Sequence, residues 1–267
     1  MYRKILVPVQ VAAEVEPLVR FASRLLEPDG EVRVLHVIPT TTLPEVTREW
    51  RASVNLVVPA HEAGAVLDIR VEPEVRAASD VAGEILESAE AHGVDAILFT
   101  LRGDRRSRNP FVGRTASALL QHARANVLVV NRLALATDAL PRILLPTFRE
   151  SPPPRALALA EELSVKAGGV QVIALAVGAS AGRAAAAPGE DWTARGVPIM
   201  RRVSPLPSAM LGRRRRLPEL MLQAAAAERY GLVIVGEEEF AGGRLLTRRF
   251  LEALFRAAPC PVMAVRA

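Results

Sequence analysis

The sequence contains few aromatic residues, a single cysteine and no long hydrophobic run. Aromatic residues make up 4% of the 267 residues although 50% of the chain is hydrophobic, so we expect a core of leucine, valine, isoleucine and alanine. Cys260 alone cannot form an internal disulfide or a multi-cysteine metal site, and we expect it to be a small buried residue. Apolar segments such as 5–9 and 127–130 are much shorter than the ~20 residues of a membrane span, and no charged-then-apolar leader opens the chain. The sequence therefore predicts a cytoplasmic protein.

Patterns typical of catalysis are also missing from the sequence. It has no Walker A loop, nucleophile elbow or paired-carboxylate motif. The four histidines show no metal-ligand spacing with one another or with Cys260, and His36 is more typical of a packed, hydrogen-bonded core residue than of a ligand. We therefore expect neither an enzyme nor a metal-binding protein.

The positive charge is concentrated in three arginine-rich segments. The chain has 34 lysines and arginines against 29 aspartates and glutamates, and arginines cluster at 102–114, 201–216 and 244–249. Such clusters are usually solvated surfaces, but they could also contact an anion or a membrane surface. Aromatic residues, which stack on bases, are not interleaved with them, and no helix-turn-helix or RNA-binding signature is present. We therefore do not expect nucleic-acid binding.

Self-comparison reveals an internal repeat. Three apolar segments recur in the same order and at a separation that changes by only a few residues. The pairs are 5–9 with 143–147, 96–100 with 232–236, and 127–130 with 262–265. A duplicated pattern of this length predicts two copies of one fold.

Each copy has short apolar runs separated by segments of helical periodicity. Such runs are typical of strands that are buried on both faces of a parallel sheet. The predicted strands are 3–9, 32–38, 67–73, 96–100 and 126–131 in the first copy, and 142–146, 170–176, 199–203, 232–236 and 262–266 in the second. The predicted helices of the first copy are 14–26, a helix that is capped by Ser79 or Asp80 and ends near His92 before Gly93, and 115–123. This β-α-β alternation predicts α/β domains with a right-handed, doubly wound parallel sheet.

The repeat also predicts the domain boundaries. Residues 133–141 have the character of a linker, which gives a first domain at 1–134 and a divergent second domain at 140–267. Within the second domain, residues 178–218 are rich in alanine, glycine and proline and predict an irregular connection.

The candidate ligand site lies at the loops after strands 1, 2 and 4 of the first copy. In open parallel sheets, ligands bind beyond the carboxyl ends of the strands, at the point where the strand order reverses.

A family resemblance is carried by segments at these loops and at the end of each copy. These segments are 5–9, 35–37, 95–99, 127–130 and 258–262 with 265–266. In these segments the chain resembles the universal stress protein family, twice along its length. The resemblance implies two tandem Rossmann-like domains, each with a five-stranded parallel sheet of order 3-2-1-4-5 flanked by helices. It also implies pairing of the two domains within the chain, with a homodimer of such chains as a further assembly.

ATP-binding members of that family carry Gly-x2-Gly-x9-Gly-Ser/Thr after strand 4. Glycines let backbone N–H groups approach the phosphates, and the following helix N-terminus adds its positive dipole end. In this sequence Thr100 replaces the first glycine, Gly103 and Gly113 are retained, and Arg114 takes the hydroxyl position, with the Thr115 hydroxyl one residue later. The acidic residue that the family places after strand 1 is replaced by Gln10, which can hydrogen-bond a ribose hydroxyl but supplies no carboxylate. The candidate nucleotide-binding residues are Pro8, Val9, Gln10, Val37, Thr100, Arg102, Gly103, Gly113, Arg114 and Thr115.

The two copies differ in what their loops could bind. In the first copy, arginines at 102–106 and at 114 could hold phosphate by charge, which would give a weak, altered site for ATP or another adenine nucleotide, or the loop is a solvated basic surface. In the second copy, three glutamates at 237–239 would repel phosphate, by about 1 kcal/mol or more for each close contact. The position after the first strand of that copy is filled by Phe148 or is missing through a one-residue deletion, so we expect no nucleotide there.

Two functions follow from the resemblance. The first is a regulatory or adaptor protein of the stress response, with at most a degenerate adenine-nucleotide site in the first domain. The alternative is a regulatory partner of a membrane transporter or of another protein, without any nucleotide. The partner itself is not identified by the sequence.

Overall fold

The computed structural model describes residues 1–40, 42–101, 114–131, 142–147, 152–177, 192–194, 197–204, 230–236, 254, 258 and 260–265. The chain divides into two compact units. The first comprises Met1–Thr100 and Val112–Leu128, and the second comprises Leu101–Phe111 and Val129–Ala267.

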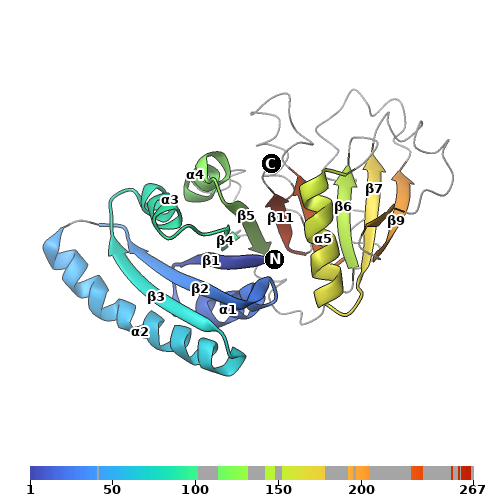
Figure 1. The fold of residues 1–267 in the computed structure, drawn as a ribbon. Coiled ribbons are helices and arrows are strands. Elements are labelled where there is room, and N and C mark those ends of the chain that lie inside the picture. The colour runs from blue at the N-terminus through green and yellow to red at the C-terminus, as the bar shows by residue number, and fades with distance from the viewer. Residues whose placement is uncertain are drawn as a thin grey trace. The chain divides into compact units, whose positions relative to one another are not determined.

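Strands of the first half form a mostly parallel sheet (Figure 1). They are β1 (Tyr2–Val9), β2 (Leu26–Ile38), β3 (Arg70–Ala77), β4 (Ala96–Leu101) and β5 (Asn126–Asn131). Their order across the sheet is β3-β2-β1-β4-β5, with parallel pairing of β1 to β2, β1 to β4 and β2 to β3. The chain therefore reverses its direction of winding between β1 and β4.

Helices cover both faces of this sheet. They are α1 (Val15–Ser23), which follows a short 3-10 turn η1 (Ala12–Glu14), and then α2 (Leu43–Leu67), α3 (Val81–Ala91) and α4 (Arg114–His122). In Figure 1, α1 and α2 lie on one face of the sheet and α3 and α4 lie on the other. The α/β class and the mostly parallel sheet flanked by helices are thus confirmed.

The second half contains a similar arrangement. Its described elements are β6 (Arg142–Thr147), α5 (Pro154–Lys166), β7 (Gln171–Val177), β8 (Trp192–Ala194), β9 (Val197–Ser204), β10 (Leu232–Gly236) and β11 (Val262–Val265). The strand order is β11-β10-β6-β7-β9-β8, and β8 runs antiparallel to β9 at the end. The sequence did not predict β8, which at three residues is too short to leave a periodic signal.

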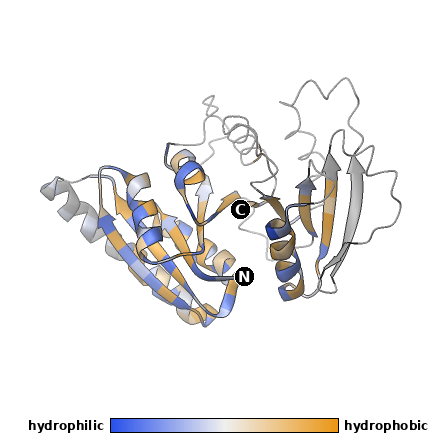
Figure 2. Cartoon of the chain, turned by 45° about the horizontal axis from the view of Figure 1, so that its top comes forward, coloured by the Kyte–Doolittle hydropathy of each residue, from blue (hydrophilic) through white to orange (hydrophobic). Residues whose placement is uncertain are grey.

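The cores consist of the predicted apolar runs. Ile5, Leu6 and Val7 of β1 are completely buried, and so are Ile143 and Leu144 of β6. Burying one such side chain contributes about 1.5–3 kcal/mol to the free energy of folding. Figure 2 shows this pattern as apolar strands in both halves of the chain. Strands that are buried on both faces must be almost wholly apolar, which is why the sequence located them well.

One helix and two strands in the first half have other boundaries than predicted. The helix predicted at 14–26 ends at Ser23, and the strand predicted at 32–38 begins at Leu26, because the Tyr2 N–H donates to the Leu25 carbonyl at 3.0 Å and draws this segment onto β1. The strand predicted at 67–73 runs instead from Arg70 to Ala77. The cause is α2, which the sequence did not predict and which extends to Leu67.

Helix α3 begins and ends as its sequence predicts. Asp80 is the N-cap, because its Oδ1 accepts a hydrogen bond from the Ala82 N–H at 3.2 Å. His92 is the C-cap, and Gly93 follows with a φ of 59°, a left-handed conformation that favours glycine.

The outer strand β3 carries charged side chains rather than an apolar stripe. Arg76 forms ion pairs with Glu74 on the same strand and with Glu84 of α3, and these two partners, Glu84 first, raise the pKa of Arg76. Pro73, which has no N–H to donate, lies within the strand. Charges and a proline at the end of the strand order disfavour pairing with a strand of another molecule.

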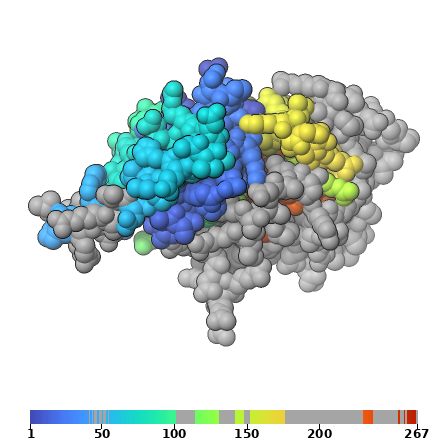
Figure 3. Space-filling view, turned by 90° about the horizontal axis from the view of Figure 1, so that it is seen from below, coloured from blue at the N-terminus to red at the C-terminus, as the bar shows by residue number. Residues whose placement is uncertain are grey.

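Helix α2 lies at the surface of the first unit, where Figure 3 shows its light-blue and cyan atoms. Leu56, Ala60 and Ala63 are buried on its inner face. Trp50 and Val66 are 50% and 78% exposed. Within the part of the chain that the structure describes, no helix is long and apolar enough to cross a membrane.

Candidate functional site

The candidate site lies at the carboxyl ends of β1, β2 and β4. These strands are parallel, so their carboxyl ends meet at one edge of the sheet. β1 pairs with β2 on one side and with β4 on the other, and the strand order therefore reverses between β1 and β4. In a doubly wound sheet, this reversal creates the crevice in which ligands bind.

Five of the predicted site residues lie at this edge. Pro8 and Val9 are the last two residues of β1, and Gln10 follows with an exposed side chain. Val37 is the penultimate residue of β2, and Thr100 is half-buried near the end of β4. The register, in which Val9 lies opposite His36, brings Val37 beside the end of β1.

The remaining predicted residues belong to the loop after β4 and to the helix that follows it. Arg102, Gly103 and Gly113 lie outside the described residues, so their prediction stays a prediction. Arg114 is exposed and is the first residue of α4, and Thr115 is half-buried next to it. The first turn of a nine-residue helix thus presents a guanidinium and a hydroxyl.

Glu14 is part of this site, although the sequence did not single it out. It follows β1 by five residues and is only 4% exposed. Its Oε2 accepts a hydrogen bond from the Gln10 N–H at 3.1 Å, and its Oε1 accepts one from the Thr100 hydroxyl at 3.4 Å. Position 10 carries no carboxylate, but Glu14 places one at the same edge of the sheet. Its hydrogen bonds connect the backbone that follows β1 with Thr100 of β4.

Local sequence explains the position of Glu14. Residues 12–14 form a 3-10 turn, and Glu14 directly precedes Val15, the first residue of α1. This tight turn brings the Glu14 side chain back towards the Gln10 backbone, four residues earlier. The signal in the sequence is a lone acidic residue between apolar neighbours at the start of a helix, which is also a common exposed arrangement.

His36 is a structural residue, as its sequence predicts. Its Nδ1–H donates to the Val9 carbonyl at 3.0 Å, and the ring is half-buried. This bond fixes the end of β2 against the end of β1. Among the described residues, no group of three or more histidine, cysteine, aspartate or glutamate side chains could hold a metal ion.

The corresponding edge of the second half offers fewer polar groups among its described residues. Thr147 ends β6 and is completely buried, and Gly236 ends β10. Phe148 and the glutamates at 237–239 lie outside the described residues, so the expected lack of a nucleotide site in this half stays a prediction. Cys260 is buried, as predicted.

Comparison with known proteins identifies the family of the first half. Residues 1–131 match the model of the universal stress protein family, so the chain contains one recognised domain of that family. No curated protein sequence matches the chain.

Solved structures extend the likeness of the fold along the chain. A universal stress protein from Archaeoglobus fulgidus is 16% identical and superimposes with a TM-score of 0.72, covering 98% of this chain and 96% of that one. A protein of unknown function from Pseudomonas aeruginosa is 13% identical, with a TM-score of 0.64 and coverage of 99% and 92%. A shorter universal stress protein from Archaeoglobus fulgidus, solved in complex with dAMP, is 20% identical over 48% of this chain and 97% of its own, with a TM-score of 0.37. At 16% and 13% identity, the likeness to the first two structures shows the fold alone.

Proposed function

We propose that this chain, which contains a universal stress protein domain at residues 1–131, is a tandem universal stress protein that acts by binding rather than by catalysis. Its role would be that of a regulatory or adaptor protein in the stress response. Its first domain would carry a weak, altered site for an adenine nucleotide, and its second domain would carry none.

Two observations support the tandem organisation. The apolar segments of the sequence repeat in order, from 5–9 and 143–147 onwards. The strand order β3-β2-β1-β4-β5 of the first half has a counterpart, β9-β7-β6-β10-β11, in the second. We propose domains at 1–134 and 140–267, each with strand order 3-2-1-4-5, and pairing of the two within one chain.

The observation that best supports a ligand site is the polar cluster where the strand order reverses. Gln10, Glu14 and Thr100 place a side-chain amide, a carboxylate and a hydroxyl at the carboxyl ends of β1 and β4. Such groups hydrogen-bond sugar hydroxyls and amino groups. Arg114 and Thr115, at the start of α4, add a positive charge and a hydroxyl that suit a phosphate.

A second candidate function is the binding of a protein partner without nucleotide. Trp50, Val58 and Val66 of α2 are 50%, 51% and 78% exposed. Large exposed apolar side chains on one helix favour a contact with another protein. We propose this role, as a partner of a transporter or of another regulatory protein, for the case in which the chain binds no nucleotide.

Calorimetric titration of the full chain with Mg-ATP, Mg-ADP and AMP tests the proposal. We expect saturable binding at one site per chain, and an Arg114→Glu variant should weaken nucleotide binding by roughly tenfold because it reverses a charge beside the site. Arg124→Glu is the matched control, since Arg124 is 86% exposed just beyond the other end of α4. No binding at millimolar nucleotide would exclude the nucleotide site and favour the partner-binding function.

A further inference from the structure

Side-chain hydrogen bonds connect the three strand ends that form the candidate site. On one side, the His36 ring of β2 donates to the Val9 carbonyl of β1 at 3.0 Å. On the other side, Glu14 accepts from the Gln10 N–H after β1 at 3.1 Å and from the Thr100 hydroxyl of β4 at 3.4 Å. The carboxyl ends of β1, β2 and β4 are therefore held relative to one another by side chains as well as by the sheet.

The bonds to Glu14 form where water is largely excluded. Glu14 is only 4% exposed, whereas Glu16, two residues later, is exposed and pairs with Arg20 at the surface. Hydrogen bonds to an ionised group are roughly twice as strong as those between neutral groups. Glu14 is thus well placed to hold Gln10 and Thr100 in position before a ligand binds.

These bonds also decide which groups of the site remain for a ligand. Thr100 has one hydroxyl proton and donates it to Glu14, so its oxygen can accept a hydrogen bond from a ligand but cannot donate one. The Gln10 N–H is likewise used by Glu14, which leaves the exposed side-chain amide of Gln10 for the ligand. The arrangement favours ligand groups that donate to Thr100, such as the hydroxyl groups of a ribose.

We infer that Glu14 is a positioning residue of the proposed site, which holds the Gln10 backbone and the Thr100 hydroxyl in the arrangement that binds the ligand. This inference rests on the proposed adenine-nucleotide function of the first domain. Glu14 acts through Gln10 and Thr100 rather than by its own contact with the ligand. Groups that are held in place before binding lose less conformational entropy when the ligand binds, and this raises affinity.

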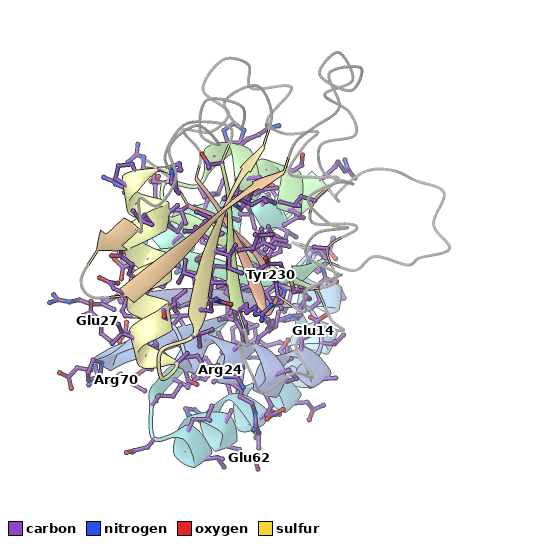
Figure 4. All side chains as sticks on the ribbon, turned by 90° about the vertical axis from the view of Figure 1, so that its right-hand side faces the viewer. Glu14, Arg24, Glu27, Glu62, Arg70 and Tyr230 are labelled. Atoms are coloured by element: carbon purple, nitrogen blue, oxygen red, sulfur yellow. The ribbon has the colours of Figure 1, made fainter. Side chains whose placement is uncertain are left out.

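Matched variants separate positioning from direct contact. Thr100→Val removes the hydroxyl with little change of shape, and Thr100→Ser, its control, retains the hydroxyl. Glu14→Ala removes the acceptor oxygens, whereas the carbonyl of Glu14→Gln can accept from the Gln10 N–H and its amide can donate to the Thr100 oxygen. Glu62→Gln controls for the change of charge, since Glu62 is exposed on α2 and lies well away from Glu14 (Figure 4).

Titration of the full-length proteins with AMP tests the inference, after thermal unfolding has shown which variants fold. We expect Glu14→Ala to weaken AMP binding roughly tenfold and Thr100→Val roughly fivefold, with no further loss when the two are combined. Any effect of Glu14 that does not act through Thr100 cancels in this double-mutant cycle. Glu14→Gln should recover most of the loss, and Thr100→Ser and Glu62→Gln should bind AMP within about twofold of the natural chain.

The possible results distinguish the inference from the proposed function. A Thr100→Val loss of the same size in the natural chain and in Glu14→Ala would overturn the inference but not the site, and so would unchanged AMP binding by Glu14→Ala. If AMP, ADP and ATP all fail to bind the natural chain, the inference and the proposed function are both wrong.

Hydrogen exchange of the Gln10 N–H gives a second measurement, which does not require Glu14→Ala to fold. We expect this amide to exchange faster in Thr100→Val than in Thr100→Ser, because the Glu14 carboxylate loses one of the groups that hold it. Equal exchange rates in the two variants would overturn the inference.

Discussion

Asp80 shows how a single side chain fixes the start of a helix. The sequence left two candidates for the cap of α3, Ser79 and Asp80, and the structure assigns the role to Asp80 through its bond to the Ala82 N–H. We expect Asp80→Ala to lower the free energy of unfolding by about 1 kcal/mol, because an N–H of the first turn loses its acceptor. Ser79→Ala is the matched control and should change stability by a few tenths of a kcal/mol. Urea unfolding measures both, and equal losses would contradict the assignment.

Cys260 is a buried thiol whose chemistry is suppressed by the fold. Burial raises the pKa of Cys260 from 9.0 to about 12, since the apolar surroundings disfavour the thiolate. The unfolded chain therefore loses this proton first, and the thiol's contribution to stability decreases as the pH rises from 9 towards 12. We expect a thiol reagent at pH 8 to label the native protein roughly tenfold or more slowly than the protein in denaturant. Equal labelling rates would show that the thiol is accessible.

Glu14 marks the limit of what sequence can predict about the site. Pro8, Val9, Val37 and Thr100 could be located from the sequence, because buried strands have a recognisable apolar pattern and their ends follow from it. The position of a carboxylate five residues after a strand depends on the turn between strand and helix, which periodicity does not determine. The 3-10 turn before α1 brings Glu14 into the crevice, and only the three-dimensional structure shows it.

Helix α2 and strand β3 are the elements that the sequence predicted least well. α2 contains Pro59 and Gly64, both of which disfavour helix, and β3 carries alternating charges instead of an apolar run. Both elements form because they pack on each other. A Cβ at Gly64 would lie 2.9 Å from Val71 Cγ2, so the two backbones approach unusually closely there.

Substituting Gly64 tests this close approach, because helix propensity and steric overlap change the stability of the protein in opposite directions. Helix propensity alone predicts that Gly64→Ala stabilises the protein by about 1 kcal/mol. We expect the reverse, a loss of roughly 1–3 kcal/mol, because the added methyl group meets Val71 and also the Ile69 carbonyl at 3.1 Å. Pairing the substitution with Val71→Ala should recover part of the loss. Chemical unfolding of the single and double variants measures this, and a stabilised Gly64→Ala protein would contradict the packing.

At the scale of the whole molecule, residues 1–131 match the universal stress protein family, and we propose that the second half is a divergent copy of the same fold. The family model covers residues 1–131 only, whereas the fold resembles that of a complete universal stress protein along nearly the full chain. The proposed duplication explains this difference, because strands and loops of a copied domain are under different physical constraints. Buried strands such as β6 and β10 must stay apolar, while a loop that has lost its ligand is free to change.

The central claim is that the first domain binds its ligand where β1 and β4 end, and amide chemical-shift mapping tests it most directly. The full chain would be titrated with AMP and with adenosine while the backbone N–H signals are followed. We predict that the largest shifts belong to Gln10, Thr100 and Thr115, with little change in α5 or in β7. Shifts confined to the second half, or none for either ligand at millimolar concentration, would contradict the claim.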